Sequence, residues 1–220
     1  MNKVLLVEGE VDDAFFGSLF RKLGKEEGIE VRVGGGVPEI FKCLKALVRT
    51  GFRQVGIALD MDDKDEEYVY RRVFDVLSNE FGTNCIEKIS SNKTNVKGTS
   101  LIVLPMSIKG EPFLQEFGVK KHEVEDYVMK MLKEDDNLVK ALSNDNFDSN
   151  ALIECLRKAL DSLKPDCIEL ISSKQLIDLV KAIIVFRASP ARIVREVVSN
   201  SNSEILENVT EDLMHDLRNW

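Results

Sequence analysis

The sequence predicts an α/β fold, in which a parallel β-sheet is covered by helices and followed by an extension made of helices. Within the first 120 of the 220 residues, short apolar runs alternate with segments that carry apolar residues at helical spacing. From about residue 121 onward only the helical spacing remains. We therefore predict two domains, an α/β domain over residues 1–120 and a helical extension over residues 121–220.

Three strand–helix units open the chain. The first has a continuous apolar run over residues 3–7, typical of a parallel strand covered on both faces, and a helical pattern over residues 12–23. The next two units have the same form, with strands predicted at residues 29–33 and 55–59 and helices at residues 38–48 and 68–81. Alternation of this kind implies a right-handed parallel arrangement.

The rest of the chain is less regular. Two further strands are predicted at residues 85–89 and 101–104, and the polar segment 90–100 between them forms either a loop or an open hairpin. Five later segments have apolar residues at helical spacing: 123–132, 150–163, 173–186, 190–198 and 203–217. The stretch 135–149 is rich in Asn, Asp and Ser, which favours a linker.

Composition limits the possible functions. With 30 Lys and Arg against 38 Asp and Glu, the formal charge of −8 has the wrong sign for a protein that coats nucleic acid, so any such contact should be local. The four cysteines form no CxxC pair, so we expect no zinc site. The apolar run at residues 4–7 is too short for a signal peptide, and no stretch is apolar enough to span a membrane, which predicts a cytoplasmic protein without membrane contact.

Acidic residues follow two of the predicted strands. Glu8 comes directly after the first strand, and Asp60 and Asp62 come after the third. Because ligands of open parallel sheets bind beyond the carboxyl ends of the strands, we expect these side chains to meet at one edge of the sheet. If the backbone stays extended, the i, i+2 spacing points Asp60 and Asp62 the same way, which suits hard cations that prefer oxygen ligands. The alternative is that each acid is a helix cap or part of a solvated turn.

At these positions the sequence resembles the Toprim superfamily. Val7-Glu8-Gly9-Glu10-Val11-Asp12 resembles its first motif, in which a strand ends in Glu-Gly, and Ile57-Ala58-Leu59-Asp60-Met61-Asp62 resembles its Asp-x-Asp strand. The resemblance covers roughly residues 3 to 105 and implies a Toprim, Rossmann-like fold. It also implies that Glu8 is a general acid or base and that Asp60 and Asp62 bind Mg²⁺ or Mn²⁺.

A fourth acid is a candidate metal ligand. The Glu125-Asp126 pair opens a predicted helix after the α/β unit and resembles a Glu-Asp pair of small stand-alone Toprim-like proteins and overcoming-lysogenization-defect nucleases. This resemblance makes Glu125 a possible further ligand. The alternative is an ordinary acidic helix N-terminus. No Gly-x-x-x-x-Gly-Lys-Ser/Thr motif occurs, so we do not expect the ATPase part of those nucleases in this chain.

The turn made by Gly34, Gly35 and Gly36 precedes the second predicted helix. Its backbone amides could bind a substrate phosphate at a helix N-terminus, and a plain tight turn accounts for the glycines equally well.

Together these observations predict a Mg²⁺- or Mn²⁺-dependent, nuclease-like phosphodiester hydrolase acting on DNA or RNA. Clustered carboxylates that hold cations neutralise the phosphate without a large basic surface. The alternative is a noncatalytic Toprim module that binds nucleic acid or a protein partner. A receiver-like or phosphatase-like α/β protein ranks last, because such proteins place paired acids after the first strand.

Overall fold

The computed structural model describes residues 3–24, 28–108, 110–144, 146–162, 171–184 and 188–220. Its first part is an α/β unit, as predicted. The strand–helix elements of this unit are β1 (Lys3–Val7), α1 (Glu10–Lys22), β2 (Ile29–Val33), α2 (Val37–Arg49), β3 (Gln54–Asp60) and α3 (Glu66–Phe81). A 3₁₀ turn (Thr83–Cys85) then leads to β4 (Ile86–Lys88), β5 (Lys93–Val96) and β6 (Thr99–Met106).

The six strands form one mixed sheet in the order β2-β1-β3-β6-β5-β4. Strands β1, β2, β3 and β6 pair in parallel, whereas β5 pairs antiparallel with both β6 and β4. The α/β class is therefore confirmed, and the expected all-parallel sheet is corrected to a mixed one. The reason is the polar segment 90–100, which contains the strand β5 and makes tight connections to its neighbours, and short connections of this kind permit only antiparallel pairing.

Each face of the sheet has its own apolar core. Successive side chains of a strand point to opposite faces. Val4 and Leu6 therefore pack with α2 and α3, while Leu5 and Val7 pack with α1. All four residues are buried, as the continuous apolar run of β1 predicts for a strand covered on both faces.

The second part of the chain is mostly helical. Its helices are α4 (Pro112–Glu116), α5 (Glu125–Glu134), α6 (Asp136–Leu142), α7 (Ser149–Asp161), α8 (Ser173–Ile183), α9 (Pro190–Asn200), α10 (Ser203–Val209) and α11 (Glu211–Arg218). It also contains a short parallel pair of strands, β7 (Val119–Lys121) and β8 (Ile171–Ser172), which the sequence did not predict. The predicted linker contains helix α6. Asp135 stabilises the start of this helix by accepting a hydrogen bond from the Leu138 amide at 3.0 Å.

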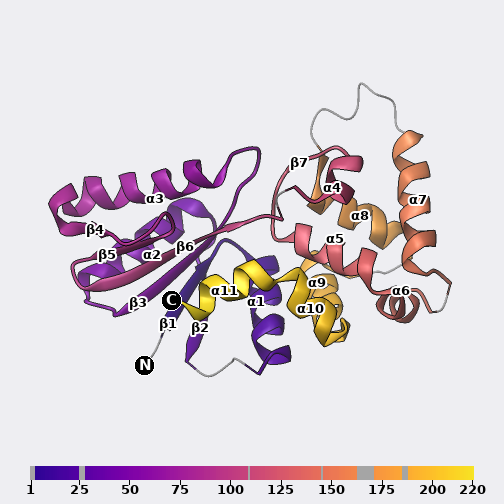
Figure 1. Ribbon diagram of the computed structural model, residues 1–220, viewed down its shortest axis with the longest axis horizontal. Coiled ribbons are helices and arrows are strands. Elements are labelled where there is room, and N and C mark those ends of the chain that lie inside the picture. Colours follow the sequence, from indigo (N-terminus) through magenta and orange to yellow (C-terminus); the bar gives the residue numbers. More distant parts are fainter. Residues whose placement is uncertain (1–2, 25–27, 109, 145, 163–170, 185–187) are drawn as a thin grey trace.

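The two parts share one apolar core. Helix α1 packs along α9, and the rings of Phe15 and Tyr127 lie 5.4 Å apart. Figure 1 shows α11 returning to the sheet, where Lys3 Nζ donates a hydrogen bond to the backbone oxygen of Trp220 at 2.6 Å. The division near residue 120 remains our proposal, and the packing ties the C-terminal helices firmly to the sheet. In the described part of the chain, no helix is both long and apolar enough to cross a membrane.

Candidate metal centre and its acidic residues

The carboxyl ends of β1 and β3 bring the predicted acids together. The two strands are neighbours in the sheet, as the sequence predicted. Glu8 is half-buried just beyond β1, and its Oε1 accepts a hydrogen bond from the backbone amide of Asp60 at 3.0 Å. Burial raises the pKa of Glu8, and the nearby charges of Asp12 and Asp62 raise it further. Glu8 and Asp60 thus lie at one edge of the sheet.

Asp60 has both a buried oxygen without a partner among the described residues and a raised pKa. Its Oδ1 is buried and has no hydrogen-bond partner in the described part of the chain. Burial raises the pKa of Asp60 well above its usual value, and repulsion from the nearby carboxylates of Asp12, Glu8, Glu125 and Glu123 adds to the shift. A buried carboxylate oxygen without a partner is costly, so this position favours a bound proton or cation.

Asp62 occupies a different environment from Asp60. It is exposed, and its φ of 52° lies in the left-handed region that few residues other than glycine adopt. Two backbone hydrogen bonds with His122, 3.0 and 2.8 Å long, hold it there. The extended Asp-x-Asp geometry expected from the sequence is therefore wrong, because β3 ends at Asp60 and this backbone bridge to His122 turns the chain. Asp62 still raises the pKa values of Glu8 and Glu123, which places its charge near theirs.

The helical part of the chain contributes Glu125 to the same cluster. Its side chain is only 4% exposed, at the start of α5. Burial raises the pKa of Glu125 to about 7, and Glu123 and Asp12 add to the rise while Lys174 opposes it. The charges of these acids therefore act on Glu125. Glu125 does lie in the acidic first turn of α5, as the alternative predicts, and it is buried there.

Two further acids complete the cluster, and neither was among the predicted site residues. Asp12 is 5% exposed in the first turn of α1, where its Oδ2 accepts a hydrogen bond from the Gly9 amide at 2.9 Å. Burial raises its pKa. Glu123 is half-buried and accepts a hydrogen bond from the Lys174 amide at 3.3 Å. Asp12 belongs to the first Toprim-like motif, so the sequence offered a signal for it. For Glu123 and Lys174 only the fold brings them to the site.

Asp126, next to Glu125, has a structural role. Its carboxylate is buried and accepts hydrogen bonds from the Ile108 amide at 3.2 Å, from His122 Nδ1 at 2.7 Å and from the Ser173 hydroxyl. These bonds tie α5 to the end of β6, to β7 and to the start of α8. The two adjacent acids thus have separate tasks, with Asp126 fixing the backbone that presents Glu125.

The glycine turn lies beside Glu8. The amide of Gly34 donates to the Val7 carbonyl, and the amides of Gly35 and Gly36 donate to the Glu8 carbonyl at 3.2 and 3.0 Å. A side chain at Gly34 would clash with Ile40, because a Cβ there would lie 2.4 Å from Ile40 Cγ1. The turn thus fixes the end of β1, and a phosphate on these amides would have to compete with the two carbonyls.

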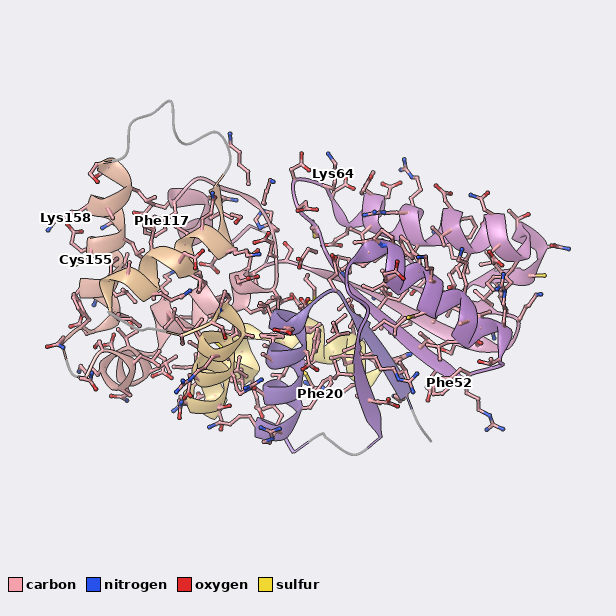
Figure 2. The ribbon with its side chains drawn as sticks, turned by 180° about the vertical axis from the view of Figure 1, so that it is seen from behind. Phe20, Phe52, Lys64, Phe117, Cys155 and Lys158 are labelled. Atoms are coloured by element: carbon pink, nitrogen blue, oxygen red, sulfur yellow. The ribbon has the colours of Figure 1, made fainter. Side chains whose placement is uncertain are left out.

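Basic residues border the acidic cluster. A small cavity of about 80 Å³ lies against Asp60 and Asp62, and Lys64, Tyr68 and Arg72 also line it. The positive charge of Arg72 lowers the pKa of Glu8. Figure 2 shows the loop that carries Lys64 at the junction between the sheet and the C-terminal helices.

The acidic cluster fits a hard divalent cation, since all of its side chains offer carboxylate oxygens. One of these oxygens, Asp60 Oδ1, is buried without a partner in the described part of the chain. In the described residues, no three His, Cys, Asp or Glu side chains already surround a single ion position. Binding would thus require side-chain rotation, for which the exposed Asp62 has room.

The family described as "Protein of unknown function (DUF3226)" matches residues 2–213. A hypothetical protein, PH0156 from Pyrococcus horikoshii OT3, is similar in structure with a TM-score of 0.62, at 17% identity over 97% of this chain and 96% of that chain. At this identity the similarity concerns the fold. No match is found among curated proteins.

The C-terminal regions of two OLD proteins are also similar. The one from Xanthomonas campestris pv. campestris has a TM-score of 0.48 and 16% identity, and the one from Burkholderia pseudomallei has 0.48 and 14%. Each match covers 97% of this chain and 97% of the other. Because the family match extends over nearly the whole sequence, the chain belongs to the DUF3226 family.

Proposed function

We propose that the protein is a Toprim-type, divalent-metal-dependent enzyme that cleaves phosphodiesters of DNA or RNA. The observation that supports this most strongly is the environment of Asp60. Its buried Oδ1 lacks a partner in the described part of the chain, and burial together with the neighbouring carboxylates raises its pKa. A divalent cation would relieve both the missing contact and the repulsion.

The acids divide into two roles in this proposal. Asp60, Asp62 and Glu125 would hold Mg²⁺ or Mn²⁺, and Asp12 and Glu123 lie close enough to influence them electrostatically. Such a metal neutralises charge on phosphate oxygens and lowers the pKa of water. Glu8 comes from another strand, and the Asp60 amide holds one of its oxygens. Burial raises its pKa above the usual value for glutamate, which favours a role in proton transfer.

The substrate contact is expected to be local. The chain has a formal charge of −8, so its surface as a whole does not attract a polyanion. Arg72 and Lys64 border the cavity beside Asp60, where they could bind the phosphates that flank the cleaved bond. Exposed Tyr68 lines the same cavity, with Lys64 Nζ 5.9 Å from its ring centre. An exposed aromatic ring can stack on an unpaired base, which favours a single-stranded or frayed substrate.

The proposal is tested by a cleavage screen with single- and double-stranded DNA and RNA in Mg²⁺, Mn²⁺ or EDTA. We expect cleavage with metal, none with EDTA, and loss of cleavage in Asp60→Asn. Absence of cleavage for every substrate would favour the second candidate, a noncatalytic module that binds nucleic acid or a protein partner. One observation fits that candidate: among the described residues, no three ligands are already arranged around one ion. Fluorescence anisotropy with labelled oligonucleotides then distinguishes the two partners.

A further inference from the structure

Strand β2 forms one edge of the sheet and is open to pairing. It has β1 on one side and no strand on the other in the described part of the chain. Its five residues, Ile-Glu-Val-Arg-Val, include three β-branched side chains, and Val33 is 46% exposed. Edge strands of monomers are usually protected by proline, a bulge or charged side chains. Strand β2 has no proline and pairs regularly with β1, and its two charges, Glu30 and Arg32, are of opposite sign. The opposite edge strand, β4, has only three residues.

The backbone direction of β2 follows from its bonds to β1. Gly28 just before the strand accepts from the Lys3 amide at 2.8 Å, and Gly34 just after it donates to the Val7 carbonyl at 2.8 Å. Because backbone groups alternate in direction along a strand, Glu30 and Arg32 also face β1. The N–H and C=O groups of the three odd-numbered residues, Ile29, Val31 and Val33, therefore point away from the sheet.

We propose that β2 pairs antiparallel with β2 of a second copy of this chain, with Val31 opposite Val31 of that copy. This register lets all three outward-facing residues bond, because Ile29 then lies opposite Val33. It also sets Glu30 opposite Arg32 twice, once on each side of the two-fold axis. The five-residue strand is thus complementary to itself in hydrogen bonding, apolar side chains and charge.

The neighbouring registers are unfavourable. A shift of two residues one way sets Glu30 opposite Glu30, and a shift the other way sets Arg32 opposite Arg32. Like charges directly opposite each other destabilise a strand pair. A shift of one residue would bring the apolar side chains to the face of the charged ones. In the single chain, Glu30 and Arg32 already form an exposed ion pair with Arg32 Nε and Glu30 Oε1 2.7 Å apart, so both side chains are extended on the same face.

The dimer would join two sheets into one continuous sheet. Antiparallel pairing sends the carboxyl ends of the two sets of parallel strands in opposite directions. The two acidic clusters therefore lie at opposite edges, and neither copy supplies residues to the other's cluster. Dimer formation and the proposed enzyme activity are independent, so the failure of one does not imply the failure of the other.

Charge-reversed variants of the full chain test this pairing by sedimentation velocity. Wild-type protein should form a concentration-dependent dimer. Glu30→Arg alone and Arg32→Glu alone should each weaken it by roughly tenfold or more, because both cross-strand pairs become repulsive. An equimolar mixture of the two single variants should restore a dimer with one copy of each. Neither variant retains the Glu30–Arg32 pair within its own chain, so only pairing between chains explains such a rescue.

Three further variants serve as controls. Glu39→Arg and Lys42→Glu change the net charge by the same amounts on exposed positions of α2, and both should dimerise like wild type. Val31→Pro removes an outward N–H and leaves the ladder to β1 intact, so it should abolish the dimer while the chain still folds. A wild-type monomer at all accessible concentrations overturns the proposal. A dimer unaffected by Val31→Pro and by both single charge reversals overturns it as well.

Discussion

Oε1 of Glu8 accepts a hydrogen bond from the backbone amide of Asp60 at 3.0 Å, across the neighbouring strands β1 and β3. The bond fixes the orientation of one acid by the backbone of the other. The charge of Glu8 in turn contributes to the raised pKa of Asp60.

Glu8→Gln should abolish cleavage while metal binding survives. Glutamine keeps the length of the side chain and its acceptor for the Asp60 amide, and it cannot exchange a proton near neutral pH. Loss of a positioned acid or base lowers the rate by roughly 10²- to 10⁴-fold. Single-turnover cleavage assays measure the rate, and calorimetry measures metal affinity. The control is Glu10→Gln, an exposed acid in the same α1 region, which should keep full activity. Equal activity of Glu8→Gln and wild type would refute the role of Glu8.

Asp60→Asn should weaken Mg²⁺ or Mn²⁺ binding by roughly tenfold or more and leave the metal-free fold as stable or more stable. The gain arises because the substitution removes one charge from a cluster of mutually repelling carboxylates. Titration calorimetry gives the affinity, and urea unfolding with and without metal gives the stability. Asp63→Asn is the matched control, because Asp63 is exposed and pairs with Lys64 at 3.1 Å. Unchanged affinity in Asp60→Asn would remove it as a ligand.

Glu125 should make the metal-free protein less stable as the pH rises. Its pKa is about 7 in the folded chain, against a usual value of 4.5. Below pH 4.5 the carboxyl is protonated in both folded and unfolded states and has no effect. Between pH 4.5 and 7 the unfolded state loses its proton first, so the free energy of unfolding falls. Above pH 7 the loss is complete, at about 3 kcal/mol.

Glu125→Gln should therefore raise the free energy of unfolding at pH 8 and leave it unchanged at pH 4. Urea unfolding in EDTA at the two pH values measures the difference. Glu134→Gln, an exposed position on the same helix, should change neither value. A stability gain of Glu125→Gln that is equal at both pH values would contradict the ionisation argument.

Asp126→Ala should lower the free energy of unfolding at pH 8, whereas Glu125→Gln should raise it. The substitution leaves the Ile108 amide, the His122 ring and the Ser173 hydroxyl without their buried acceptor. We expect a loss of roughly 2–5 kcal/mol in the free energy of unfolding. Thermal and urea unfolding measure it, with Glu125→Gln as the neighbouring comparison. An unchanged free energy of unfolding in Asp126→Ala would show that these bonds do not organise α5.

Local sequence patterns predicted most strands and helices of the α/β unit. The run Lys3–Val7 predicted β1 as a strand buried on both faces, and its abrupt end predicted where Glu8 would lie. Because parallel strands end at a common edge, the sequence predicted that Glu8 and Asp60 lie at the same edge of the sheet. The sequence left segment 90–100 as a loop or an open hairpin and did not predict strand β5, Lys93–Val96, because its polar side chains carry no alternating apolar pattern. This strand forms by pairing with its neighbours β4 and β6.

The sequence by itself determined the α/β class, the order of its first three strand–helix units and the acids at the ends of β1 and β3. Only the tertiary structure decided how the other acids act on them. Asp12, Glu123 and Glu125 raise the pKa of Asp60 through space, and the positions of Glu123 and Glu125 depend on the Asp62–His122 bridge and on the bonds of Asp126. The physical reason is that local spacing encodes which residues share a face of one element. Burial and repulsion between charges depend on distances set by packing between elements far apart in the chain.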